Sequence, residues 1–505
     1  MEPLNICNNA SLIYNYDEDP DYIKQTAISY IPPPNRHLDF KEPEEICFTL
    51  ESSESLDVNF EKLLSIKTEK FLELDFSIFS DKNDLNELLK LKETLSKIPS
   101  HIFQINRKKA NPTEFCSVSI FQNRSAVKLA NLDYALINFR RKYNFNSFLD
   151  LCSGPGGFTE YLYWRVGFNL KGLGITLKGV QDFKPPLHPN FKPFYGKDGT
   201  GDITVEQNFL ALSEFDQFDF VLADGGVACD EDKGNQEEHV KQLILCEIIS
   251  AFITLRKDGD FLLKLFDALT PFTVELIYLL HKSFQKISLI KPVSSRPSNS
   301  EKYIYCEKFK FEKPPLAIIT HLKTCNFELN KLNKVFFDMN SKSNQMSRHS
   351  NSEMQNKNSF ITLSEKIELG LLNLTDIMNR SVVLNDGKFM NFIRSFNKRF
   401  YLQQFNALAE LIEFCNEPQK YNYDRNAITK FYFQRWNIEY PEEIIPYQND
   451  ESADSRKRGR GRGRGKQTKF ISNSFKDGKY NYTQTNRKRE AAVDYHQNYK
   501  RSKFG

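Results

Sequence analysis

Four charged residues stand where apolar runs of the sequence begin, end or are interrupted. Asp224 follows the run FDFVLA, Lys264 lies inside FLLKLF, Glu301 precedes KYIYCEKF, and Lys128 lies upstream in SAVKLANL. A partly desolvated lysine beside a second ammonium group loses its proton more easily and can act as a general base. Neighbouring carboxylates hold such a lysine in place but oppose the loss, so the sign of the net pKa shift is not fixed by sequence.

The elements that must position these residues are short strands separated by amphipathic helices. Between about residues 110 and 310, a helical pattern over 238–255 ends near Asp258-Gly259. The predicted strands are 147–152, 172–177, 218–223, 260–266 and 302–309. This alternation predicts βαβ units and a mostly parallel sheet, in which ligands collect at the carboxyl ends of the strands. If the strand after Glu301 runs antiparallel, its start lies at that same edge.

A glycine-rich loop, LDLCSGPGGF, spans residues 149–158 and joins an apolar strand to a helix. Glycines at such a place let the backbone turn sharply and approach a ligand beside the helix N-terminus. The loop lacks the GK[ST] of a Walker-type phosphate site and the GxGxxG of dinucleotide folds. The sequence therefore predicts a ligand loop of another kind.

The stretch SGPGGFTEYLYWR resembles motif I of the FtsJ-type S-adenosylmethionine-dependent RNA 2′-O-methyltransferases. Three further stretches resemble that family in order: FQNRSAVKLANLDY, then GITLKG with YGKDGTGDIT, then SRPSNSEKYIYC. The similarity covers roughly 100–310 and is greatest to members that methylate the first transcribed nucleotide of capped mRNA. It implies an α/β fold, a Rossmann-like class I methyltransferase with a mostly parallel sheet, flanking helical segments and a disordered basic tail.

The resemblance also implies a Lys-Asp-Lys-Glu catalytic set, here Lys128, Asp224, Lys264 and Glu301. Methylating a ribose hydroxyl needs in-line attack by a poor nucleophile, so a base and groups that orient it are useful. We assign Lys264 as the base that takes the 2′-hydroxyl proton. Lys128 and Glu301 would tune and orient it, and Asp224 would fix Lys264. No metal is expected.

The binding residues are likewise implied by the resemblance. The residues expected to hold S-adenosylmethionine are Asn123, Cys152, Ser153, Gly154, Pro155, Gly156, Gly157, Phe158 and Asp202. The residues expected to contact the capped RNA are Lys92, Arg107, Asn235, Gln236 and Glu301. The basic cluster NRKKAN around Arg107 suits the phosphate bridges of a capped 5′ end.

Charge is unevenly distributed along the 505 residues. Residues 451–505 hold 16 Lys or Arg against 5 Asp or Glu and include RKRGRGRGRGK, which suits a polyanion partner or nuclear import.

The nine cysteines form no CxxC pair, and no apolar run is long enough to span a membrane. We therefore expect a nuclear protein without a zinc site, a disulfide framework or a membrane span.

The expected organisation follows these changes in composition. It comprises a loosely ordered N-terminal segment (1–55), a helical lead-in (56–105), the FtsJ-type domain (106–315), a connector (316–340), a disordered insert (341–359), a small helical C-terminal unit (360–450) and a disordered basic tail (451–505).

The implied partner is the 7-methylguanosine-capped 5′ end of mRNA, together with RNA polymerase II or the capping machinery. Three alternatives stay open. The chain could methylate another RNA ribose, such as the second cap nucleotide or an rRNA site, or be an inactive RNA-binding scaffold with the same fold. A small-molecule methyltransferase is the third, which the basic segments disfavour.

Overall fold

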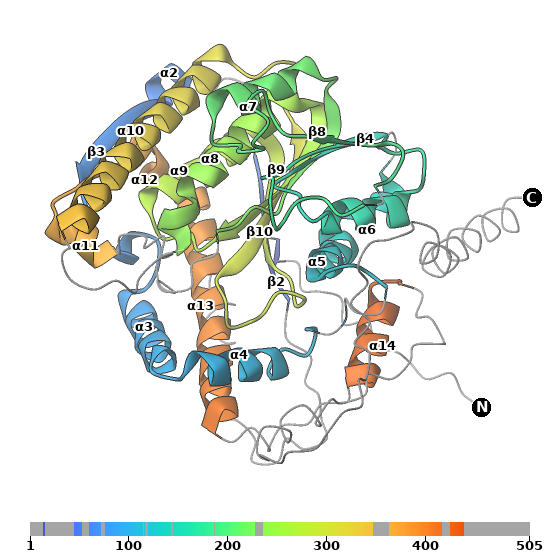
Figure 1. Ribbon diagram of the computed structural model, residues 1–505, viewed down its shortest axis with the longest axis horizontal. Coiled ribbons are helices and arrows are strands. Elements are labelled where there is room, and N and C mark those ends of the chain that lie inside the picture. The colour runs from blue at the N-terminus through green and yellow to red at the C-terminus, as the bar shows by residue number, and fades with distance from the viewer. Residues whose placement is uncertain are drawn as a thin grey trace, which may run out of the picture. The chain divides into compact units, whose positions relative to one another are not determined.

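A central β-sheet flanked by helices forms the core of the computed structural model (Figure 1). The structure describes residues 14–15, 45–52, 60–71, 76–114, 116, 120–142, 145–185, 187–227, 236–346, 363–416 and 425–438. The sheet strands are β1 (Tyr14–Asn15), β2 (Ile46–Glu51), β4 (Ser147–Leu151), β5 (Lys171–Ile175), β6 (Phe191–Phe194), β7 (Phe218–Ala223), β8 (Leu255–Phe266), β9 (Phe284–Lys291) and β10 (Glu301–Phe309).

The strand order identifies the architecture. It runs β1-β2-β9-β10-β8-β7-β4-β5-β6. The adjacent strands β8, β7, β4, β5 and β6 are parallel to one another, and β10 is antiparallel to both of its neighbours. Counted from β4 along the chain, the parallel part has the order 3-2-1-4-5 of a doubly wound Rossmann-like sheet. The chain reverses its direction of winding between β4 and β7, so a crevice for ligands is expected at their carboxyl ends. The predicted mostly parallel α/β fold is confirmed.

The two faces of the sheet pack against different helices, because successive side chains of a strand point to opposite faces. Leu222, Leu262 and Tyr303 belong to an apolar cluster with residues of α5 (Arg124–Leu132), α6 (Gly157–Val166) and α14 (Arg425–Arg435). Val221 and Leu263, their chain neighbours, pack in a second cluster. That cluster includes residues of α8 (Gln236–Thr254), α9 (Pro271–Ser283) and α13 (Gly387–Asn416).

The lead-in and the C-terminal unit differ from the purely helical prediction. The lead-in contains α2 (Phe60–Leu63), β3 (Leu64–Lys70), η1 (Phe76–Ile78), α3 (Lys82–Ser96) and α4 (Ser100–Lys109). Its strand pairs antiparallel with β11 (Leu372–Met378), which lies inside the expected helical unit. The leucines of the lead-in fit a helical period, but backbone pairing with a strand some 300 residues away decides their structure.

The structure differs from the prediction at three further places. The expected connector is part of α10 (Leu316–Met346), one helix of 31 residues that enters the first positions of the expected insert. Strand β2, almost entirely buried beside β9, lies inside the segment expected to be loosely ordered. Strand β9 was not predicted, because it follows α9 without turn residues between them. Residues 347–359 and the basic tail, 451–505, lie outside the described residues.

The remaining elements are short. They are η3 (Asp133–Ile137), η4 (Phe139–Arg141), α7 (Glu206–Leu210), η5 (Ala211–Glu214), α11 (Leu363–Glu368) and α12 (Arg380–Asn385). Among the described helices, none combines the length and apolarity needed to cross a membrane.

Candidate active site

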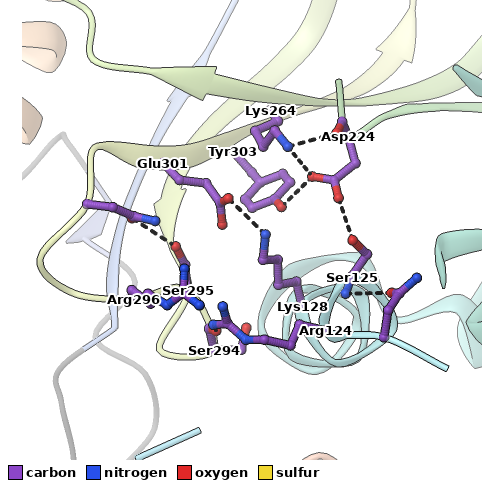
Figure 2. A network of polar contacts seen from close by, with 12 residues as sticks. Arg124, Ser125, Lys128, Asp224, Lys264, Ser294, Ser295, Arg296, Glu301 and Tyr303 are labelled. Atoms are coloured by element: carbon purple, nitrogen blue, oxygen red, sulfur yellow. Dashed lines mark hydrogen bonds and ion pairs between the residues drawn. The ribbon is translucent and has the colours of Figure 1, made fainter. Parts of the chain in front are cut away.

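Two lysines and two carboxylates from distant parts of the chain meet beside α5 (Figure 2). Lys128 Nζ lies 2.8 Å from Glu301 Oε2, and Lys264 Nζ lies 3.0 Å from Asp224 Oδ1. Lys264 also donates to the backbone carbonyl of Asp224 at 2.7 Å. The structure thus brings together the four residues expected to form the catalytic set, which we call the tetrad.

Strand register explains this convergence. Tyr303 of β10 lies opposite Lys264 of β8, and Glu301 lies two residues before Tyr303 and therefore on the same face. Asp224 follows β7, next to β8, in step with Leu222. All three side chains therefore point to the α5 face, where Lys128 approaches from the helix.

Two hydroxyl groups that the sequence reasoning did not single out complete the site. Ser125 Oγ donates to Asp224 Oδ2 at 2.8 Å, and Tyr303 Oη donates to Asp224 Oδ1 at 2.8 Å. Both Asp224 oxygens are therefore held, which fixes the carboxylate against Lys264. Tyr303 could have been predicted from the sequence, because it lies two residues after Glu301 in the same strand and therefore points to the same face.

Charge pairing outweighs burial at three members of the tetrad. Burial alone would raise the pKa of both carboxyls, but the ammonium groups of Lys264 and Lys128 hold the pKa of Asp224 below its ordinary value. The same two ammonium groups, Lys128 first, hold that of Glu301 well below its usual range. Burial would lower the pKa of Lys264, but Asp224 and Glu301 raise it above its ordinary value. In the free protein Lys264 therefore keeps its proton at neutral pH.

The glycine loop follows β4 and passes close to its neighbours. A Cβ on Gly154 would lie 1.8 Å from the carbonyl oxygen of Gln181, and one on Gly157 would lie 2.1 Å from Asn123 Oδ1. Gly156, with φ of 108°, precedes the first residue of α6. Only glycine fits where the backbone packs this closely, so the loop presents bare backbone at the helix N-terminus.

The residues around this loop have the chemistry to hold S-adenosylmethionine. The buried Nδ2 atom of Asn123 has no hydrogen-bond partner among the described residues, while its Oδ1 caps α5 by accepting from the Ser125 amide at 2.9 Å. Such an orphaned donor beside a glycine loop can bind a carboxylate or hydroxyl oxygen of a ligand. The loop and Asn123 thus fit the amino-acid end of the cofactor.

Other expected cofactor residues occupy different surroundings. Phe158 is only 2% exposed and its ring centre lies 6.4 Å from that of Tyr303, so it packs the loop against the tyrosine that bonds Asp224. Asp202 Oδ1 accepts from the amide and hydroxyl of Thr204, at 2.8 and 2.7 Å. The preceding Gly201 lies against Thr176, whose hydroxyl accepts from the Gly154 amide at 3.1 Å. The Asp202 turn is therefore one strand away from the glycine loop.

The remaining loop residues are held by local bonds. Ser153 donates its amide to the Ile175 carbonyl at 3.2 Å and accepts from the Gly156 amide at 2.7 Å. Cys152 has a positive φ of 52°, and Pro155 follows Gly154 through a cis peptide bond. These contacts give the loop a fixed shape across the ends of β4 and β5.

The expected RNA contacts are only partly brought to the tetrad. Gln236 is near it, because its Oε1 accepts from Ser300 Oγ at 3.3 Å, one residue before Glu301. Arg107, in the last turn of α4, donates to Gln104 at 2.6 Å and lies over the Phe103 ring. Lys92 lies on α3, and Asn235 lies outside the described residues.

Comparison with known proteins agrees with this geometry. Residues 121–309 match the model of the FtsJ-like methyltransferase family, a span that includes the glycine loop and the tetrad. Within the described residues, no group of three or more His, Cys, Asp or Glu side chains is placed to hold a metal ion.

Three relatives share one name, cap-specific mRNA (nucleoside-2′-O-)-methyltransferase 1. The Danio rerio protein is 30% identical over 412 residues, which is 76% of this chain and 45% of the relative. The Dictyostelium discoideum protein is 39% identical over 49% of this chain and 37% of its own, and the Homo sapiens protein is 36% identical over 53% and 35%. The chain thus spans less than half the length of each of these relatives.

The family match, the strand order and the charged residues beside the glycine loop point to one conclusion. The domain at residues 121–309 is an FtsJ-like methyltransferase domain.

Proposed function

We propose that the chain transfers a methyl group from S-adenosylmethionine to the ribose 2′-hydroxyl of the first transcribed nucleotide of capped mRNA. The observation that carries the proposal is the position of Lys264 Nζ, which two oxygens of Asp224 hold at 2.7 and 3.0 Å. The names of the relatives support the capped substrate. The proposed substrate is the 7-methylguanosine-capped 5′ end, and the proposed location is the nucleus, where the basic tail and the capping machinery or RNA polymerase II would meet nascent RNA.

The cofactor would supply an electrophilic methyl group on a sulfonium, held by Asn123 and the glycine loop. Lys264, once neutral, takes the 2′-hydroxyl proton at Nζ as the oxygen attacks. Asp224 orients that nitrogen, while Tyr303 and Ser125 keep Asp224 from rotating. The Lys128–Glu301 pair, 2.8 Å apart, fixes the other side of the site.

This assignment predicts a pH dependence. Because Asp224 and Glu301 raise the pKa of Lys264, only a small neutral fraction exists at neutral pH. That fraction grows about tenfold per pH unit below the pKa. We therefore expect kcat to rise with pH from neutral well into the alkaline range, measured with short capped oligonucleotides that stay intact there. A kcat that is constant above neutral pH would contradict Lys264 as the base.

The decisive experiment compares matched capped and uncapped RNAs. Label is transferred from methyl-labelled S-adenosylmethionine, and nuclease mapping then locates the modified ribose. The proposal predicts label on the first transcribed nucleotide and a requirement for the 7-methylguanosine cap. Label on the second nucleotide, or equal labelling of uncapped RNA, would favour another ribose of RNA as the substrate. Absence of transfer to any RNA would favour a binding scaffold.

A further inference from the structure

A buried carboxyl group lies directly behind the tetrad. Glu247, in the middle of α8, is 0% exposed, and its carboxyl group faces the Cys152 thiol and the backbone of Gly225. The charged form of an ionisable group is costly to bury, so its position calls for an explanation. No step of the proposed mechanism uses it.

Only a thin layer of backbone separates Glu247 from Lys264. A Cβ on Gly225 would lie 2.2 Å from Glu247 Oε1, and a Cβ on Gly226 would lie 3.3 Å from Lys264 Nζ. Both glycines directly follow Asp224, whose carbonyl accepts from Lys264. The turn after β7 therefore has Glu247 against one glycine and the Lys264 ammonium against the next.

The groups that face each partner come from several elements. Glu247 interacts electrostatically with Lys264 on β8 and Asp224 after β7, and with the thiol of Cys152 after β4. Lys264 interacts electrostatically with Asp224, Glu301 and Glu247. Burial raises the pKa of Glu247 to about 8, so its carboxyl is protonated at neutral pH. The Cys152 thiol, whose pKa burial raises well above its usual value, stays neutral there.

We propose that Glu247 is a positioning residue for catalysis that controls whether Lys264 can release its proton. As a neutral acid, Glu247 leaves the Lys264 ammonium held by Asp224 and Glu301 alone. As a carboxylate, it adds a third negative charge and retains the Lys264 proton. When the pH rises, one proton leaves the site to water from either group, and its loss from Glu247 delays its loss from Lys264.

The proposal rests on the proposed role of Lys264 as the base. It predicts that removing the carboxyl charge moves the alkaline rise of kcat toward lower pH. Glu247→Gln keeps the shape of the side chain, Glu247→Leu removes its polarity as well, and Glu247→Asp keeps a carboxyl. We expect Gln and Leu to raise kcat by about tenfold on the part of the rising limb above about pH 8, where wild-type Glu247 is charged. The Asp variant should shift the rise least.

The measurement is single-turnover methyl transfer to short capped RNA between about pH 6 and pH 10, a range that includes the pKa of Glu247 and lies on the rising limb below the raised pKa of Lys264. Equilibrium binding of S-adenosylmethionine checks that the pocket is intact and should stay within severalfold of wild type. Gln and Leu profiles that superimpose on the wild type, or that move to higher pH, would overturn the proposal. So would a shift in the Leu variant alone, because the cause would then be shape rather than charge.

Failure of this inference differs from failure of the proposed function. If Lys264→Ala abolishes transfer while Glu247→Gln leaves the pH profile unchanged, only the role of Glu247 is wrong. If Lys264→Ala retains transfer, the base assignment itself is wrong.

Discussion

Two neighbouring residues of β10 serve two different buried clusters. Glu301 points to the α5 face and pairs with Lys128 of the tetrad at 2.8 Å. Lys302 points to the opposite face, where it is 0% exposed, lies 3.7 Å from Asp267, and has its ammonium 4.1 Å from the centre of the Phe400 ring on α13. We call this second group, with Glu237 and Tyr401, the α13 cluster.

Contact with carboxylates separates the two clusters. Lys264 has two oxygens of Asp224 within 3.0 Å, and its pKa is raised despite burial. Lys302 has no hydrogen-bond partner among the described residues, and burial lowers its pKa to about 8, with the charge of Lys92 adding to the lowering. The two buried lysines therefore differ in how closely a carboxylate holds them, because Asp224 bonds Lys264 directly whereas Asp267 lies 3.7 Å from Lys302.

The largest effect is expected at Lys264. Its replacement by alanine should reduce methyl transfer by about 10³-fold or more, because the only proposed base is lost. Cofactor affinity should stay within severalfold of wild type, measured by calorimetry. The matched control, Lys302→Met, removes a lysine that is also buried but lies on the other face, and it should keep kcat within severalfold. Similar losses of kcat in both variants would erase the distinction between the clusters.

The free energy of unfolding, unlike kcat, should fall when Lys302 is replaced. Lys302→Met removes the ammonium group 3.7 Å from the buried Asp267, whose carboxyl also accepts from the Tyr401 hydroxyl at 3.2 Å. Removing one partner of a buried pair costs about 3–5 kcal/mol of unfolding free energy. Denaturant titration at neutral pH measures the loss. An unchanged midpoint would show that the cation–π contact and the ion pair contribute nothing net, and the proposed structural role would then be wrong.

A smaller effect concerns pH and Glu237 of the α13 cluster. Burial raises its pKa to about 7 from 4.5, so the folded state binds more protons than the unfolded state between these values. Stability therefore falls as pH rises through this window, by about 1–3 kcal/mol. Denaturation of Glu237→Gln at several pH values should show a flatter dependence there.

The tetrad carboxylates change the pH dependence of stability in the opposite direction to Glu237. The pKa values of Asp224 and Glu301 are lowered, so their contribution to stability is present at neutral pH and is lost below about pH 4.5. A Glu237→Gln curve that parallels the wild type between pH 5 and 7 would contradict the opposed signs of the two clusters.

Local pattern predicted four of the five adjacent parallel strands and the glycine loop, but it missed β6 (Phe191–Phe194). The runs ending before Asp224 and beginning after Glu301 are the strands β7 and β10 almost to the residue. The helical face of α8 also carried a signal that was missed. Glu247 follows Val240 and Ile244 at helical spacing, so a carboxyl on an apolar face was visible in the sequence.

Pairing between distant segments could not be predicted in the same way. Strand β3 has leucines at helical spacing nearby and gains its structure from β11. Phe400 lies about 100 residues after Lys302, and nothing in either local sequence indicates that the ring covers the ammonium.

The sequence by itself determined which residue types were available and the order in which they occur: two lysines, two acids and a glycine loop. Tertiary structure alone decided the rest. The antiparallel insertion of β10 between β8 and β9 places Glu301 and Lys264 on one face, and the single-residue step to Lys302 turns the next charge to the other. The physical reason is that strand side chains alternate faces, so register and neighbours, set by contacts across hundreds of residues, decide which charges meet.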